Sequence, residues 1–256
     1  MLSNIIEIII LSIVQGISEF LPISSSAHLN IVEIIFGFNS SSQMIDVSLH
    51  FGSLLAIIFY FRKELLDLQN NKKLLSLLVI GSIPIVIAGY IINTTGLINL
   101  LENNLKLIAW TTLIFGIILY LADKCKFDKN ISSNLNFKTM LYIGLFQIFA
   151  LIPGVSRAGI TITAARFFRF NRFDSSKISF LLAIPAIAGA SVLQLKNAIG
   201  QSFDFNYLIL ISITLSFLFS YFTVKFFLDY INKFSLNVFV IYRIIISIIL
   251  FIIIYN

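Results

Sequence analysis

Six long apolar stretches constrain the fold of this chain more than any other feature. Each has roughly 18 to 22 residues, the length that an α-helix needs to cross the hydrocarbon core of a bilayer. They lie at residues 44–61, 74–92, 105–122, 178–199, 207–224 and 238–255. Only 12% of the 256 residues are charged and 58% are hydrophobic, too few charges to cover the surface of a soluble enzyme or a nucleic-acid-binding protein. The sequence therefore predicts an all-α polytopic membrane protein, with one integral membrane domain over residues 1–256.

Two further apolar stretches, at about 4–38 and 139–170, are too long for one span, and each is interrupted by proline near its middle. The distribution of Lys and Arg predicts how they cross. Fourteen of the 18 basic residues lie in four short polar stretches, which we expect on the cytoplasmic side. These stretches are 62–73, 123–138, 166–177 and 225–237. Two of them flank the second broken stretch, so that segment must start and end on the cytoplasmic side as a hairpin. By the same reasoning the first broken stretch starts and ends on the outer side, which makes it a hairpin inserted from the opposite face of the membrane.

Three spans follow each hairpin, so we predict two repeats of inverted topology, each a re-entrant helical hairpin plus three transmembrane helices. The repeats cover about 1–122 and 137–256. Local sequence agrees, since Gln15 and Gln147 precede the breaks, and Ser25 and Ser156 each follow the proline of the break by three residues. Repeats of this kind place their ligand site near the midplane, where broken helices meet. The two hairpin tips are thus the predicted site.

The first tip is rich in polar side chains. Gln15 and Glu19 are one helical turn apart and share a face. Three hydroxyls and an imidazole follow within a few residues: Ser24, Ser25, Ser26 and His28. A glutamate at bilayer depth costs several kcal/mol unless it is paired or binds a cation, which indicates a function. The alternative is structural, with the serines capping the second half-helix and Glu19 bonded to backbone amides.

On the next span, Asp46 and His50 are one helical turn apart and could orient each other behind the site. A packing role is the alternative interpretation of this pair.

The second tip has the composition of an anion site. Its break and the following turn offer Gly154, Ser156, Arg157 and Thr161. Free amides at a helix start attract anions, and a guanidinium can bind two phosphate oxygens at once. The alternative is that Arg157 forms a structural salt bridge with Glu19, which would not exclude phosphate binding. We expect Arg243, like Lys225 and Lys233, to anchor a helix end at the cytoplasmic headgroups.

With both tips in view, the sequence resembles the undecaprenyl-diphosphate phosphatase family, also called the bacitracin-resistance protein family. The resemblance covers nearly the whole chain and rests on two motifs. One is Gln15 to Glu19 followed by Leu-Pro-Ile-Ser-Ser-Ser-Ala-His28, and the other is Pro153-Gly-Val-Ser-Arg-Ala-Gly-Ile-Thr161. It implies a multi-pass enzyme of the bacterial cytoplasmic membrane that hydrolyses undecaprenyl diphosphate to the monophosphate, the lipid carrier for peptidoglycan, and confers bacitracin resistance. The active site would face the periplasm or exterior.

The resemblance also implies roles for individual residues. Glu19, Ser25, His28 and Arg157 would be catalytic, and Gln15 and Glu19 would bind a divalent cation, Mg2+ or else Ca2+. Phosphate would be bound by Ser24, Ser26, Gly154, Ser156, Arg157 and Thr161. Ser25 is our candidate nucleophile with His28 as its acid or base, while direct attack by His28 or by a water is left open.

The sequence departs from the family pattern at two positions. Position 15 is Gln where many members have Glu, which removes one charge from the cation site. Ala158 replaces the second serine of the usual Ser-Arg-Ser-Gly run, so that hydroxyl cannot be essential here.

The competing class is a transporter, because inverted repeats with midplane half-helices are also the architecture of secondary carriers. The same features could flip polyprenyl phosphate across the bilayer without breaking a bond. Binding and transport of a phosphate need only donors such as arginine. The serine, histidine and glutamate beside it are the side chains that a hydrolytic reaction needs, which favours the phosphatase. A third class, the intramembrane serine proteases, is disfavoured because this sequence lacks their Gly-x-Ser-Gly motif. The expected partners are the lipid substrate and membrane lipids, with no nucleic acid, and the chain could form a homo-oligomer.

Overall fold

The computed structural model describes residues 2–36, 43–97, 101, 104–199 and 207–255, and these are helical apart from turns and one isolated bridge. The first half contains α1 (Leu2–Ser18), α2 (Ser25–Phe36), α3 (Gln43–Tyr60), α4 (Arg62–Asp67), α5 (Lys72–Thr94) and α7 (Leu105–Lys124). The second half contains α8 (Ile131–Asn134), α9 (Phe137–Gln147) with a 3-10 turn at Ile148–Leu151, α10 (Arg157–Phe167), α11 (Arg172–Ile199), α12 (Tyr207–Ile231) and α13 (Asn237–Tyr255).

All six predicted spans are helices in this structure. Within the described residues, α5, α7, α11, α12 and α13 are long and apolar enough to cross a bilayer. The apolar part of α3, Met44–Tyr60, is shorter. The prediction of an all-helical polytopic membrane protein is thus confirmed.

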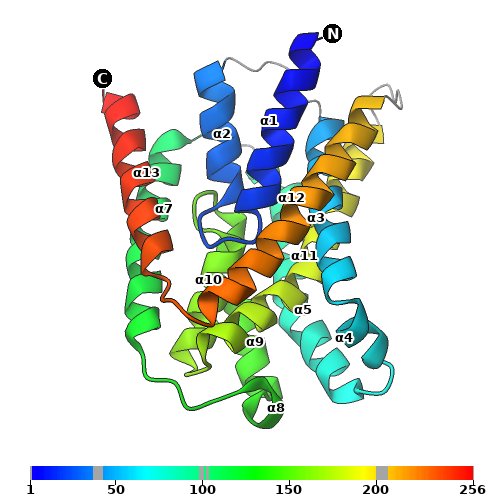
Figure 1. Cartoon of the computed structure of the whole chain (residues 1–256), viewed down its shortest axis with the longest axis vertical. Helices are drawn as coiled ribbons and strands as arrows, with labels where there is room; N and C mark the ends of the chain where they lie inside the picture. Colours follow the sequence, from blue (N-terminus) through cyan, green and yellow to red (C-terminus); the bar gives the residue numbers. More distant parts are fainter. Residues whose placement is uncertain (1, 37–42, 98–100, 102–103, 200–206, 256) are drawn as a thin grey trace.

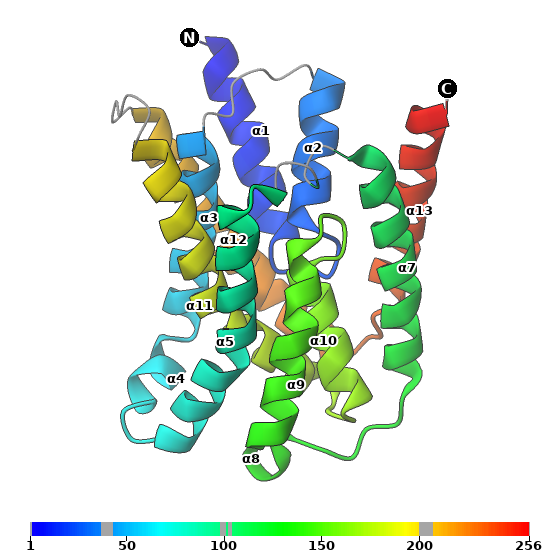
Figure 2. The same ribbon diagram turned by 180° about the vertical axis from the view of Figure 1, so that it is seen from behind.

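Both proline-broken stretches fold back on themselves at the predicted places. α1 and α2 form one helical pair, and α9 and α10 form the other (Figure 1). The two pairs extend from opposite ends of the molecule, and their turns meet at mid-height, in Figure 1 and in the reverse view of Figure 2. Residues that are distant in the sequence therefore come together in the interior.

The four basic stretches gather at the end of the molecule that carries α4 and α8 (Figure 1). Asp123, at the end of α7, accepts hydrogen bonds from Arg172 Nε at 2.7 Å and from the backbone amide of Leu236 at 3.2 Å. Lys177 Nζ lies 3.0 Å from Glu64 Oε1 of α4. These contacts join all four stretches, as expected if they share one side of the membrane.

Close helix approach fixes the first hairpin and α3 against α12. A Cβ added at Gly16 of α1 would lie 2.5 Å from Phe219 Cβ, and one added at Gly52 of α3 would lie 2.5 Å from the Ile213 carbonyl oxygen. Buried hydroxyls also link these helices, since Ser53 Oγ lies 3.0 Å from Ser216 Oγ. In lipid the hydrophobic effect does not drive helices together. Close van der Waals packing at small residues and hydrogen bonds between serines stabilise such contacts instead.

Candidate active site

Glu19 and Arg157 form an ion pair where the two hairpin tips meet. Arg157 Nη2 lies 3.0 Å from Glu19 Oε1, and the two side chains are only 11% and 7% exposed. Arg157 Nη1 also donates to the carbonyl oxygen of Ser179 on α11, at 3.3 Å. The salt bridge considered from the sequence is therefore present, and it places opposite charges from the two halves of the chain in one buried site.

The second oxygen of the Glu19 carboxylate is the acceptor for two further groups. Gln15 Nε2 and Ser25 Oγ each donate to Glu19 Oε2 at 2.9 Å. His50 Nδ1 lies 2.9 Å from Gln15 Nε2 and 3.7 Å from Glu19 Oε2. An amide N–H can only donate, so His50 Nδ1 is the acceptor in its contact with Gln15. Ser25 thus presents a hydroxyl whose proton already points to a carboxylate, the arrangement of a nucleophile with its base.

The two tips share an unusual backbone conformation. Ser24 and Ser156 have φ angles of 76° and 71°, and each directly precedes the first residue of a half-helix, α2 or α10. Ser156 also caps α10, since its Oγ accepts from the Gly159 amide at 3.1 Å. The sequence-based pairing of Ser25 with Ser156 is therefore wrong by one residue. The turn, and not the proline, sets the register, so Ser24 matches Ser156 and Ser25 matches Arg157.

A cavity of about 210 Å³ opens between the two tips, α3, α5 and α11. Its polar lining consists of seven of the residues considered above: Glu19, Ser24, Ser25, Ser26, His50, Ser156 and Arg157. The first residues of both α2 and α10 are among them. Helix N-termini carry partial positive charge and unpaired amides, so the cavity suits an anion.

Two predicted phosphate ligands lie outside the lining of this cavity. Gly154 has a φ of 87°, and a Cβ there would overlap the side chain of Thr111 on α7, so this residue shapes the turn. Thr161 is fully buried, and its hydroxyl donates to Ser179 Oγ at 2.7 Å, which fastens α10 to α11. Both residues lie in the scaffold around the site, and a direct role in phosphate binding stays a prediction.

His28 and Asp46 also lie outside the lining of the cavity. His28 Nδ1 is 2.6 Å from the Ser24 carbonyl oxygen, and Nε2 is 2.7 Å from the Tyr242 hydroxyl on α13. A carbonyl only accepts, so Nδ1 donates to it and Nε2 accepts from the tyrosine. Asp46 is half-buried one turn before His50 on α3. A direct catalytic role for His28 stays a prediction, and its ring contacts here link α2 to α13.

The prediction that Arg243 anchors a helix end at the cytoplasmic headgroups is wrong. Arg243 is 1% exposed and lies in the interior, not at the headgroups. Its guanidinium donates to the carbonyl oxygens of Gly154, Val155, Thr112 and Pro22, at 2.9, 3.0, 3.1 and 3.3 Å. It therefore joins both tips to α7 and α13. A lone arginine inside an apolar span, away from its ends, was the signal for this role.

The fold and the site together define a class: a polytopic helical membrane protein with a polar cavity between two hairpin tips. Comparison with known proteins shows the family. Residues 8–249 match the family described as Bacitracin resistance protein BacA. The chain is 91% identical to the undecaprenyl-diphosphatase of Pelagibacter ubique (strain HTCC1062), over 100% of both chains. It is 40% identical to the undecaprenyl-diphosphatase of Elusimicrobium minutum (strain Pei191), over 96% of this chain and 97% of the relative. This chain belongs to the bacitracin resistance protein BacA family.

Proposed function

We propose that this protein is a membrane phosphatase that hydrolyses undecaprenyl diphosphate to undecaprenyl phosphate and inorganic phosphate. The observation that carries the proposal is the Ser25–Glu19–Arg157 chain of contacts at the tips, with a hydroxyl, a carboxylate and a guanidinium in hydrogen-bond contact. The printed name of the relative that is 91% identical, undecaprenyl-diphosphatase, supports the same reaction. Recycling of this lipid carrier serves peptidoglycan synthesis and accounts for bacitracin resistance, after which the family is named.

Arg157 is the main phosphate ligand in this proposal. Its Nη2 is held by Glu19 and its Nη1 by a carbonyl of α11, which fixes the plane of the guanidinium at the cavity wall. The amides at the starts of α2 and α10 and the hydroxyls of Ser24 and Ser26 supply further donors. Preorganised donors stabilise the negative charge that develops on the transferred phosphoryl group.

Ser25 is the nucleophile that the geometry favours. Its Oγ would attack the terminal phosphorus as Glu19 Oε2 takes the proton, and the bond from that phosphorus to the bridging oxygen would break. Undecaprenyl phosphate would leave with the bonding electrons and take up the proton from Glu19. Glu19, again a carboxylate, would then deprotonate a water that attacks the phosphorus of the phosphoserine. The bond from that phosphorus to Ser25 Oγ would break, inorganic phosphate would leave, and the proton on Glu19 would restore the Ser25 hydroxyl. Attack by a water directly remains a second route through the same base, and His28 would first have to leave its bonds to Ser24 and Tyr242.

A divalent cation fits this site as an oxygen-bound ion. Gln15 Oε1 is buried without a hydrogen-bond partner, and a half-turn of the amide would bring this oxygen beside Glu19 Oε2. Among the described residues no three His, Cys, Asp or Glu side chains gather, so phosphate oxygens and waters would have to supply most of the coordination. Mg2+ is commonly bound in this way, with one or two carboxylates and the substrate phosphates. Bound there, it would neutralise phosphate charge, while Gln15 and Glu19 hold and orient it.

The finer topology is part of the proposal. The opposed hairpins, each followed by three long helices, support two inverted repeats in a bacterial cytoplasmic membrane. The basic end would be cytoplasmic. The tips would then lie near the midplane and open toward the periplasm or exterior, where the diphosphate is released by envelope synthesis.

Phosphate release from long-chain prenyl diphosphate by purified protein in detergent micelles tests the function. Micelles have no two sides, so a transporter would release no phosphate. Arg157→Ala should lower kcat/KM by about 100-fold or more, because a charged donor to the developing charge is lost. Arg169→Ala, at a 52% exposed arginine paired with Asp128, is the matched control and should behave as wild type. Full activity of Arg157→Ala would overturn the phosphate site, and loss of activity in EDTA, restored by Mg2+, would support the cation.

A further inference from the structure

An apolar groove between α5 and α11 continues directly from the phosphate cavity. The groove has a volume of about 440 Å³ and shares four lining residues with the cavity: Ile85, Leu151, Ala186 and Ala190. The remaining lining consists of apolar residues with Tyr90, Asn93 and Gln194, and no lining side chain is charged. A ligand that fills both spaces would therefore carry an anionic group at one end and an uncharged apolar chain at the other.

Two glycines, one on each facing helix, make this groove as wide as it is. A Cβ added at Gly189 of α11 would meet no atom within 4 Å, and one added at Gly89 of α5 would meet only Leu151 Cδ2, at an ordinary 3.8 Å. Helix packing therefore does not demand glycine at either position, in contrast to Gly16 and Gly52. Glycine inside a helix lowers the stability of the protein by about 1 kcal/mol relative to alanine. The two glycines therefore keep the groove open at the expense of stability.

We infer that this groove, with Gly89 and Gly189 as its floor, binds the first isoprene units of the substrate's polyprenyl chain while the diphosphate lies against Arg157. The inference rests on the proposed phosphatase function and adds where the lipid part is held. A volume of about 440 Å³ falls in the ~300–1,000 Å³ range of sites for small molecules, so the groove takes the head-proximal part of a long chain. The rest of the chain lies in the surrounding lipid.

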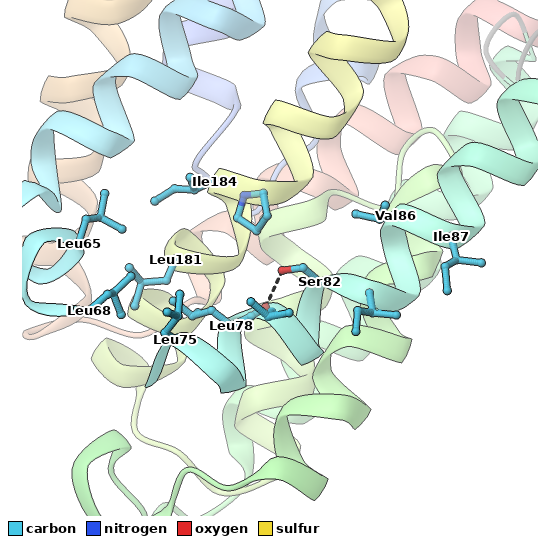
Figure 3. A pocket seen from close by; sticks show the side chains of 12 residues that line it. Leu65, Leu68, Leu75, Leu78, Ser82, Val86, Ile87, Leu181 and Ile184 are labelled. Carbon is cyan, nitrogen blue, oxygen red and sulfur yellow. Dashed lines mark hydrogen bonds between the residues drawn. The ribbon is translucent and has the colours of Figure 1, made fainter. Parts of the chain in front are cut away.

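A second apolar groove lies on the same two helices, closer to α4 (Figure 3). Its volume is about 430 Å³ and its side chains include Leu65, Val79 and Ile184. The hydroxyl of Ser82 is satisfied inside its own helix, by the Leu78 carbonyl oxygen at 2.7 Å, as the dashed line in Figure 3 shows. This groove adjoins the first one at Val86 but has no lining residue in common with the phosphate cavity. It serves as the control, because it offers similar volume and chemistry without direct contact with the diphosphate cavity.

The experiment compares two substrates on groove-filling variants. Gly189→Leu and Gly89→Leu place side chains into open space and raise helix propensity, so the variants should fold. Val79→Phe fills the second groove, where this residue is 53% exposed. For each protein, kcat/KM is measured with undecaprenyl diphosphate and with methyl diphosphate, a short-chain reference that has no isoprene unit, and folding is checked by thermal unfolding in detergent.

Both glycine variants should lower the ratio of long-chain to short-chain kcat/KM by about tenfold or more, through KM for the long chain. Val79→Phe should leave that ratio at the wild-type value. An unchanged ratio in the glycine variants would overturn the inference, as would a change confined to Val79→Phe, which would place the chain in the second groove. If wild-type protein released phosphate from neither substrate, the phosphatase proposal itself would fail, which is a distinguishable result.

Discussion

Ser24 and Ser156 occupy the same place in the two hairpins, each with a positive φ angle and each directly before a half-helix. Their side chains lie in the lining of one cavity, so the two turns face each other across the site. Non-glycine residues rarely adopt this backbone region, and residues held there cluster at functional sites. The strain of the two serines thus lies where the two half-helices begin, at the wall of the cavity.

The first prediction concerns this strain. At Ser156 we expect glycine to be better tolerated than alanine by about 1 kcal/mol in the free energy of unfolding. Both substitutions remove the cap on Gly159, but only glycine relieves the positive φ. Thermal or chemical unfolding in detergent measures the difference. Ser212, inside α12, is the control, since there alanine should be the more stable replacement. If alanine were the more stable replacement at both positions, the positive φ angle of Ser156 would not be a source of strain.

The second prediction concerns the hydrogen bond between His28 and Tyr242. His28→Asn and Tyr242→Phe should each reduce stability, and the double variant should be less destabilised than the sum by about 1 kcal/mol, because the same bond is lost. A double-mutant cycle of unfolding free energies gives the coupling. Strict additivity would mean that the two side chains do not interact.

The same two variants separate the possible roles of His28. If its function is to fasten α2 to α13, Tyr242→Phe and His28→Asn should reduce phosphate release to a similar extent, by about tenfold or less. If His28 transfers a proton to the substrate, only His28→Asn should lower the rate of phosphate release by about 100-fold or more. Steady-state kinetics in micelles distinguishes the outcomes.

The third prediction concerns Arg243. Arg243→Lys should lower the unfolding free energy by roughly 3 kcal/mol, because an ammonium has no planar fork with which to reach four carbonyls, and buried acceptors lose their donors. Unfolding in detergent measures the loss, and Arg169→Lys, on the exposed surface, should be near neutral. Wild-type stability of Arg243→Lys would show that the carbonyl contacts do not stabilise the tips.

The fourth prediction tests the nucleophile. Ser25→Ala should lower kcat by about 1,000-fold or more, since the group that receives the phosphoryl is removed. Ser26→Ala, one residue further along α2, is the control and should cost far less, because its hydroxyl contacts Ser24 and not Glu19. Mass spectrometry of acid-quenched wild-type protein should detect phosphate on Ser25. A loss under tenfold in Ser25→Ala would shift the assignment to a water or to His28.

Much of the fold could be predicted from the sequence because a bilayer allows few solutions. Apolar length alone located the six long helices, and proline together with the basic stretches located the two hairpins. The contact between Glu19 and Arg157 could also be predicted, because burying either charge at the depth of the bilayer costs free energy unless the charge is paired.

The details that could not be predicted depend on where side chains point after folding. Arg243 bonds to Pro22 and Val155, which are 221 and 88 residues away in the sequence, and no local pattern encodes such pairs. The match of Ser24 with Ser156 was missed because it follows backbone torsion and not spacing from the prolines. His28 follows the site motif closely, yet its ring turns to α13, which spacing along the chain cannot reveal.

The position of Arg243 in the chain has a consequence for biosynthesis. The residue that bonds to the carbonyls of both tips belongs to α13, the last helix in the described part of the chain, whereas the tips themselves are made earlier. Both hairpins are therefore synthesised before the group that holds them in register. A chain interrupted before α13 would contain every residue that lines the phosphate cavity but would lack the donor that joins the two tips, so we expect such a chain to be inactive.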